Sequence, residues 1–148
     1  MAKTLETFRG MVYPWQLDHM GHMNVQFYTA RFDEASWHFF ASIGITQRYL
    51  REAGRGMAAL EQNTLYKREL LAGSLIYIES ELIEMRAKTV RFRHRMIEAE
   101  SGAEAASTEL VAVHMDSAQR KSAPFPPSIY PSAAGNDDPG AKRPADGR

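Results

Sequence analysis

The sequence predicts a single α+β domain in which a curved antiparallel sheet wraps around one long apolar helix. Three observations lead to this fold class. Residues 25–43 carry apolar side chains at helical spacing. Four later stretches alternate in the manner of β-strands and are joined by short connections. The chain has 148 residues, enough for one domain of ordinary size and hardly for two.

A first strand is expected over residues 7–13, and the long helix follows it. Asn24 suits the N-cap of this helix, and Gly44 suits the left-handed position just after its end. Apolar residues recur along one helical face at steps of three and four: Tyr28, Phe32, Ala35, Phe39 and Ile43. Further apolar residues on its other faces, such as Phe27 and Trp37, predict a helix that is enclosed on several sides.

Four strands are expected after the helix, over residues 57–67, 74–86, 88–98 and 103–116. The alternation is cleanest in the third of them, where Val90, Phe92, His94 and Met96 alternate with Arg91, Arg93 and Arg95. His94 shares the apolar face, which is more typical of a core histidine than of a catalytic one. Glu100-Ser101-Gly102 predicts a hairpin turn that pairs the last two strands antiparallel.

Composition excludes several classes of protein. Lys plus Arg and Asp plus Glu number 18 each, a balance that argues against a dedicated nucleic-acid binder. Cysteine is absent, which excludes disulfides, thiolate metal sites and a cysteine nucleophile. The sequence shows neither an apolar run of about 20 residues nor an N-terminal signal segment. We therefore expect a cytoplasmic protein that does not insert into membranes.

The composition changes near the C-terminus. Residues 132–148 contain no Val, Ile, Leu, Met, Phe, Trp or Tyr. Such a segment cannot bury enough apolar surface to offset its ordering entropy, so we expect a disordered tail. Pro124, Pro126 and Pro127 precede it and forbid helix. The predicted folded domain therefore covers residues 1–131.

The densest polar cluster, residues 18–24, lies between the first strand and the helix. Gly21 permits close backbone approach, and the start of the helix offers unpaired N–H groups and a partial positive charge. A carboxylate such as Asp18 beside such a terminus can act as base or nucleophile, while the N–H groups stabilise an oxyanion. This combination favours acyl transfer or hydrolysis.

The motif Asp18-x-x-Gly21-His22-x-Asn24, followed by Tyr28, resembles that of the hotdog-fold acyl-CoA thioesterases, in their 4-hydroxybenzoyl-CoA thioesterase-like branch. The similarity covers roughly residues 5–127. Weaker matches follow at Ile43-Gly44-Ile45, Tyr66, Gly73, residues 89–97 and 110–116, and Arg120-Lys121. The resemblance implies a hotdog fold, no metal or other cofactor beyond the CoA of the substrate, and homodimers or homotetramers with active sites at subunit interfaces.

The resemblance also implies roles for single residues. Asp18 matches the catalytic carboxylate, Asn24 and Val25 match the oxyanion site at the helix terminus, and Gly21 and His22 match positions that shape the loop. The chain departs from the family at Val25, where a second Asn is common. It departs again at Ser74, where Asp is common. The first departure matters little if the oxyanion donor is a backbone N–H.

Residues 19–28, 32–35 and 54–61 are similar to the thioesterase domains associated with carnitine dehydrogenase, which are thought to act on betainyl-CoA. Aromatic faces attract quaternary cations. This narrower resemblance implies pocket candidates for a trimethylammonium group: Tyr13, Trp15, Tyr28 and Trp37.

Other interpretations stay open at three places. Asp18 with His19 and His22 could bind zinc or iron, although their spacing matches no strong metal motif. Glu61 and Asn63 could supply a second acid or base, or could face water on a strand. The arginines of residues 91–95 could hold CoA phosphates, or form a solvated face or a subunit contact.

The predicted function is hydrolysis of a small acyl-CoA thioester to the free acid and CoA. Asp18 would attack the thioester carbonyl, or would activate water as a general base. Betainyl-CoA is one candidate substrate. The competing hypothesis from a different class is a non-catalytic module that binds acyl-CoA or serves oligomerisation.

Overall fold

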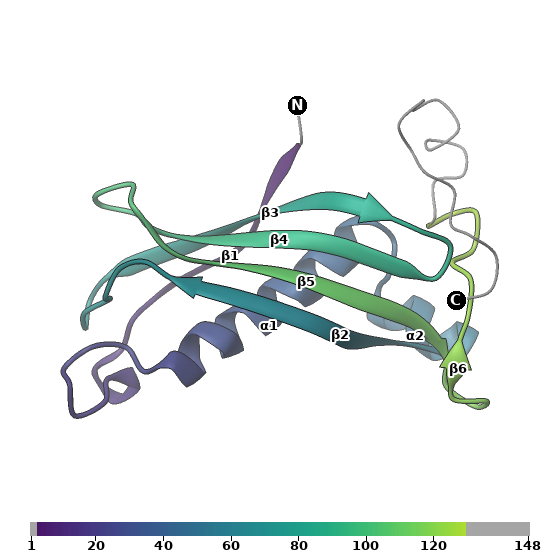
Figure 1. Ribbon diagram of the computed structural model, residues 1–148, viewed down its shortest axis with the longest axis horizontal. Coiled ribbons are helices and arrows are strands. Elements are labelled where there is room, and N and C mark those ends of the chain that lie inside the picture. The colour runs from purple at the N-terminus through teal and green to yellow at the C-terminus, as the bar shows by residue number, and fades with distance from the viewer. Residues whose placement is uncertain (1–2, 130–148) are drawn as a thin grey trace.

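The computed structural model describes residues 3–129, so the predicted disordered tail lies outside the described residues. The elements follow in the order β1 (Thr4–Met11), η1 (Pro14–Gln16, a 3-10 helix), α1 (Val25–Ser42), α2 (Gln47–Ala53), β2 (Arg55–Tyr66), β3 (Leu75–Met85), β4 (Thr89–Glu98), β5 (Glu104–Asp116) and β6 (Lys121–Ser122). The antiparallel sheet has the order β1-β3-β4-β5-β2, and β6 pairs with β5. Figure 1 shows α1 lying along one face of this sheet.

The long helix begins and ends as the sequence predicts. The Asn24 side chain accepts a hydrogen bond from the Gln26 amide, and Gly44 after the helix has a φ of +97°. The first strand is displaced from its prediction, since it begins at Thr4 and ends at Met11. It stops earlier because Pro14, which has no N–H to donate to a sheet, starts η1 instead.

Helix α2 was not predicted from the sequence, although its start and stop signals are present. The Thr46 hydroxyl accepts a hydrogen bond from the Tyr49 amide, and Gly54 ends the helix with a φ of +62°. None of its seven residues is buried, which explains why no apolar periodicity marked it.

Irregular registers account for the curvature of the sheet. Each of the four long strand pairs contains a register shift, for example between Ala59 and Glu61 in β2 and between Leu82 and Glu84 in β3. An extra residue on one strand bends it and increases its twist. The sheet can therefore curl around α1 instead of lying flat against it.

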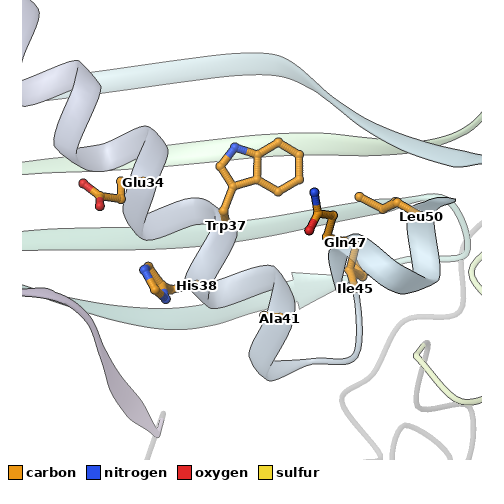
Figure 2. A pocket seen from close by; sticks show the side chains of 7 residues that line it. All are labelled: Glu34, Trp37, His38, Ala41, Ile45, Gln47 and Leu50. Carbon is orange, nitrogen blue, oxygen red and sulfur yellow. The ribbon is translucent and has the colours of Figure 1, made fainter.

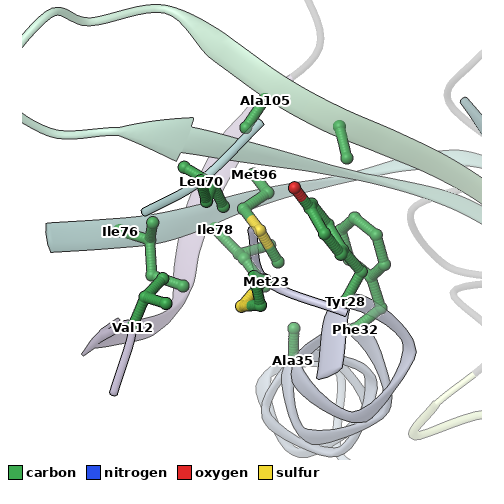
Figure 3. Packing of buried hydrophobic residues seen from close by; sticks show 11 residues of the cluster. Val12, Met23, Tyr28, Phe32, Ala35, Leu70, Ile76, Ile78, Met96 and Ala105 are labelled. Carbon is green, nitrogen blue, oxygen red and sulfur yellow. The ribbon is translucent and has the colours of Figure 1, made fainter. Parts of the chain in front are cut away.

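Two apolar clusters fill the space between α1 and the concave face of the sheet. The first lies around the amino-terminal half of α1 and contains buried side chains from the helix, the strands and the intervening segments: Val12, Met23, Tyr28, Phe32, Ala35, Leu70, Ile76, Ile78, Met96, Ala105 and Ala106 (Figure 3). The second lies around the carboxyl-terminal half, where Phe92 of β4 packs against Phe39 and Phe40. The long helix thus binds the sheet along its whole length.

Only one face of α1 is buried in the single chain. Tyr28, Phe32 and Phe39 are at most 4% exposed, whereas Val25 is 56% and Trp37 46% exposed. The expectation of a helix enclosed on several sides is therefore wrong for one chain, because the sheet curls around α1 without closing over its outer face.

A chain of buried polar side chains crosses the first cluster and joins α1, β4, β3 and β1. The Ser36 hydroxyl lies 2.8 Å from Nε2 of His94, and the Ser80 hydroxyl lies 2.5 Å from Nδ1. The Thr7 hydroxyl lies 2.7 Å from that of Ser80. Both ring nitrogens therefore have partners, and His94 is a satisfied core histidine as the sequence indicates. Burial lowers the pKa of His94 to about 3, so the ring is neutral.

This neutral ring makes the stability pH-dependent. An unfolded histidine takes up a proton near pH 6.5, whereas folded His94 does so only near pH 3. Between these values the unfolded state binds more protons, so the free energy of unfolding falls as the pH falls, by at most about 1.4 kcal/mol per pH unit. We expect His94→Gln, which stays neutral, to lack this contribution.

Urea unfolding of the wild type and of His94→Gln, between about pH 7 and pH 4, measures the contribution of His94 to the pH dependence of stability. The free energy of unfolding of the wild type should fall relative to that of the variant as the pH is lowered. A difference between the two proteins that stays constant over this range would contradict a neutral, buried ring.

Candidate active site

The segment between η1 and α1 forms a tight loop at the amino end of α1. Leu17 and Met23 pair as an isolated β-bridge and close the loop. Inside it, the Asp18 amide donates to the His22 carbonyl at 3.1 Å, and the Gly21 amide donates to the Asp18 carbonyl at 3.0 Å. Gly21 has a φ of +83°, a conformation that side chains disfavour. The turn at Gly21 therefore fixes where Asp18 lies.

Two hydrogen bonds hold the Asp18 carboxylate. Its Oδ1 accepts from the Met20 amide at 2.9 Å, and its Oδ2 accepts from Nδ2 of Asn24 at 3.0 Å. The other end of the same Asn24 amide group caps α1, because its Oδ1 accepts from the Gln26 amide at 3.0 Å. One side chain thus attaches the carboxylate to the amino end of the helix.

These contacts set the charge of the carboxylate. The Asn24 side chain and then the Met20 amide hold the pKa of Asp18 below its usual value, because both donate to the ionised form. Asp18 is therefore an anion at neutral pH. Each of its oxygens retains a second lone pair for a substrate carbon or for a water molecule.

The first amide of α1 lies at the same place. Val25 is the first residue of the helix, so its N–H has no partner within the helix. Over residues 3–129, no acceptor for this N–H is found among the hydrogen bonds. The donor and the positive end of the helix dipole are thus available to a group that binds beside Asp18.

Asp18 and Val25 line one groove with a volume of about 610 Å³. The loop and α1 form one wall, and the end of β2 with the residues after it forms the other: Tyr66, Lys67, Arg68 and Glu69. Three contacts join the walls. The Met23 amide donates to the Leu70 carbonyl at 2.8 Å, His22 Nε2 lies 2.9 Å from a Glu69 carboxylate oxygen, and the Tyr28 hydroxyl donates to the Arg68 carbonyl at 3.1 Å.

Tyr28 is the only one of the four aromatic pocket candidates among the residues lining this groove. Its ring meets that of Tyr66 edge to face, with centroids 5.2 Å apart. Burial, with smaller contributions from Tyr66 and Glu69, raises the pKa of Tyr28 to about 12. The hydroxyl therefore stays protonated and serves as a hydrogen-bond donor.

The other three aromatic candidates lie elsewhere in the chain. Tyr13 and Trp15 stack on each other beside η1, and Trp15 packs edge-on against Phe27. Trp37 is 12 residues beyond Val25 along α1, about 18 Å at 1.5 Å per residue. It lines a separate cavity of about 550 Å³ between α1 and α2, with Glu34 among its neighbours (Figure 2).

Glu61 and Asn63 face the other side of the sheet. Asn63 of β2 lies opposite Glu109 of β5, and Glu109 lies opposite Arg93 of β4. Directly opposed residues share a face, and Arg93 alternates with the buried residues of β4. Within one chain, the two candidates for a second acid or base are therefore separated from Asp18 by the sheet.

The arginine stripe lies on this convex face and is paired with carboxylates on both neighbouring strands. Arg91 bonds to Glu109, Arg93 to Glu81 and Glu109, and Arg95 to Glu79 and Glu104. The arginine stripe is therefore part of a network of ion pairs with glutamates, and each arginine already has an anionic partner.

Lys67, Arg68 and Glu69, which line the second wall, were not predicted as site residues from the sequence. Charged residues after a strand usually face water, and only the pairing of β2 with β5 shows that they return to the loop at Asp18. Ser74, one of the two departures from the family pattern, lies outside the groove, where its hydroxyl accepts from the Leu71 amide at 3.3 Å.

Over residues 3–129, no group of three or more His, Asp or Glu side chains has an arrangement that could hold a metal ion, so Asp18, His19 and His22 do not form such a group. In the same range, no helix has the length and apolar character required to cross a membrane.

Solved structures share this fold. A hypothetical protein from Staphylococcus aureus in complex with CoA superimposes with a TM-score of 0.81, at 21% identity over 97% of this chain and 90% of that one. A 1,4-dihydroxy-2-naphthoyl-CoA thioesterase from Synechocystis gives a TM-score of 0.76, at 17% identity over 93% of this chain and 100% of that one. The predicted hotdog fold is thereby confirmed.

Sequence comparison agrees. An L-carnitine dehydrogenase/betainyl-CoA thioesterase from Rhizobium meliloti (strain 1021) is 28% identical over 113 residues, which are 76% of this chain. The chain spans only 23% of the length of that relative. The profile of the thioesterase-like superfamily matches residues 12–132, which include the loop, α1 and the whole second wall of the groove. The chain therefore belongs to the thioesterase-like superfamily.

Proposed function

We propose that the chain hydrolyses a small acyl-CoA thioester in the groove at the amino end of α1, with Asp18 as the catalytic carboxylate. One observation carries the proposal: the Asn24 side chain holds an ionised Asp18 beside the unpaired Val25 amide. Hydrolysis of a thioester needs an anion to attack or to take a proton, and a donor for the oxyanion that forms. Both groups line the same groove.

In the nucleophilic route, an Asp18 oxygen attacks the thioester carbonyl carbon. The C–S bond breaks, CoA leaves as the thiolate, and the acyl group remains as a mixed anhydride with Asp18. Water then opens the anhydride and regenerates the carboxylate. In the general-base route, Asp18 takes a proton from the attacking water and returns it to the leaving sulfur. The Val25 N–H stabilises the oxyanion in both routes.

Betainyl-CoA is our candidate for the substrate. The name of the Rhizobium meliloti relative supports it, since that protein is a betainyl-CoA thioesterase as well as a dehydrogenase. Betainyl is a trimethylammonioacetyl group, which is small enough for the groove. A short acyl chain also agrees with the position of the carboxylate at an open groove close to the protein surface.

We further propose that two or four copies assemble and that β2 is the contact strand. It is one edge of the sheet, so the N–H and C=O groups on one side of it lack strand partners. It also exposes apolar side chains, with Leu60 58% and Leu65 55% exposed. Its last residue, Tyr66, lines the groove, so a second copy on β2 would lie next to the site.

Replacing Asp18 by Asn tests the catalytic carboxylate. Asn keeps the shape of the side chain but cannot attack or accept a proton, so we expect turnover to fall by about 100-fold or more. The measurement is thiol release from betainyl-, short aliphatic, long aliphatic and aromatic acyl-CoAs. Asp33→Asn, on the exposed side of α1, is the matched control and should match the wild type. CoA binding by the wild type without turnover of any substrate would instead indicate a binding module.

Replacing Val25 by Pro tests the oxyanion donor, because proline has no N–H. Proline is favoured at the first position of a helix, and Asn24 before it already has φ −67° and ψ 147°, which proline requires of its predecessor. We expect kcat/KM to fall about 100- to 1000-fold while the circular dichroism of the helix is retained. Val25→Ala keeps the N–H and should stay within about threefold of the wild type. Equal activity of the Pro and Ala variants would exclude this donor.

Charges on β2 test the assembly. In sedimentation, the wild type should have at least twice the chain mass of 16.7 kDa. Because charged side chains oppose edge pairing, the double variant Leu60→Glu/Leu65→Glu should sediment as a monomer. Leu71→Glu, 56% exposed but outside β2, is the control and should leave the mass unchanged. A monomeric wild type at tens of micromolar would refute the contact.

A further inference from the structure

The groove is lined by two carboxylates, Asp18 and Glu69, and by two cations, Lys67 and Arg68. Asp18 bonds only to uncharged donors, and Glu69 contacts only the His22 imidazole. Neither forms an ion pair with a lysine or arginine among residues 3–129. Lys67 pairs with Glu104 on β5, so its charge is engaged away from the contact between Glu69 and His22.

Asp18 and Glu69 remain as the anions of the groove without a permanently charged partner. An acyl group with its own carboxylate would be repelled there, and one with a positive charge would be attracted.

An aromatic ring lies beside these anions. Tyr66 is 49% exposed, and the edge-to-face contact with the buried Tyr28 fixes the orientation of its ring at the groove. Glu69 follows three residues later and is held by His22 at 2.9 Å. An aromatic ring together with a carboxylate suits a quaternary ammonium group, which has no N–H to donate and is recognised through its charge and its methyl surface.

From this arrangement we infer that Tyr66 and Glu69 select an acyl group that carries a quaternary ammonium close to the thioester carbonyl. The inference rests on the proposed thioesterase activity and assigns the specificity of the same groove to its second wall. Asp18 and Val25 act on the carbonyl, while Tyr66 and Glu69 bind the acyl group. Both residues come from one short segment, residues 66–69, which begins at the last residue of the edge strand β2.

A matched pair of substrates tests the inference. Trimethylammonioacetyl-CoA and 3,3-dimethylbutanoyl-CoA have the same shape, because a charged nitrogen in one replaces a carbon in the other. The wild type should hydrolyse the cationic substrate with a kcat/KM at least about 10-fold higher. A cation over an aromatic ring is worth roughly 2- to 30-fold in affinity, and the carboxylate adds to it. The preference should also shrink as salt is added, since salt screens an exposed carboxylate.

Single substitutions then test whether Tyr66 and Glu69 cause the preference for the cationic substrate. Glu69→Gln and Tyr66→Leu should each lower kcat/KM for the cationic substrate by about fivefold or more, and by a clearly larger factor than for the neutral one. Glu52→Gln, an exposed carboxylate of α2 paired with Arg48, is the control outside the groove and should preserve the preference.

The outcomes separate the inference from the proposed function. Equal hydrolysis of both substrates by the wild type would overturn the cation site and leave the thioesterase intact. Equal losses for both substrates in the variants would show a merely structural role and would also overturn it. If no acyl-CoA is hydrolysed, the proposed function fails and the inference fails with it.

Discussion

The site depends on the two hydrogen bonds of the Asn24 side chain. Its oxygen caps α1 by accepting from the Gln26 amide, and its nitrogen donates to Asp18. An Asp in this place would cap the helix equally well but would repel the Asp18 carboxylate, and a Ser is too short to reach both groups. The amide of Asn24 thus couples the start of the helix to the position and charge of the carboxylate.

The sheet determines which part of the chain can hold such a site. Its concave face is filled by α1 and by apolar side chains, and on its convex face the arginines of β4 pair with glutamates of β3 and β5. These arginines already have anionic partners. The amino end of α1 differs, since a helix start necessarily leaves N–H groups free. Chemistry is therefore concentrated where secondary structure cannot satisfy its own hydrogen bonds.

The helix and strands with a strong periodicity of apolar residues could be predicted from the sequence. Contacts that depend on which strands pair could not. The long helix and the strands after it were recovered because burial imposes a repeat on residues such as Phe32 and Phe92. The cluster at Asp18 was also found, since its glycine, carboxylate and N-cap are local signals. The second wall was not found, because Glu69 reaches the loop only through the pairing of β2 with β5. Trp37, a pocket candidate taken from the narrower resemblance, lines a different cavity, about 18 Å along α1 from Val25.

The two walls of the groove belong to different parts of the fold. The wall that carries Asp18 is fixed by the helix start and by the turn at Gly21, so few substitutions are compatible with it. The second wall is a short exposed segment, joined to the first by the Met23 amide, by His22 and by the Tyr28 hydroxyl. Two of these three contacts use a backbone carbonyl of the second wall, which any residue supplies. Side chains in this segment can therefore change without moving Asp18, and under the proposed function this would allow one arrangement at the helix start to serve different acyl groups.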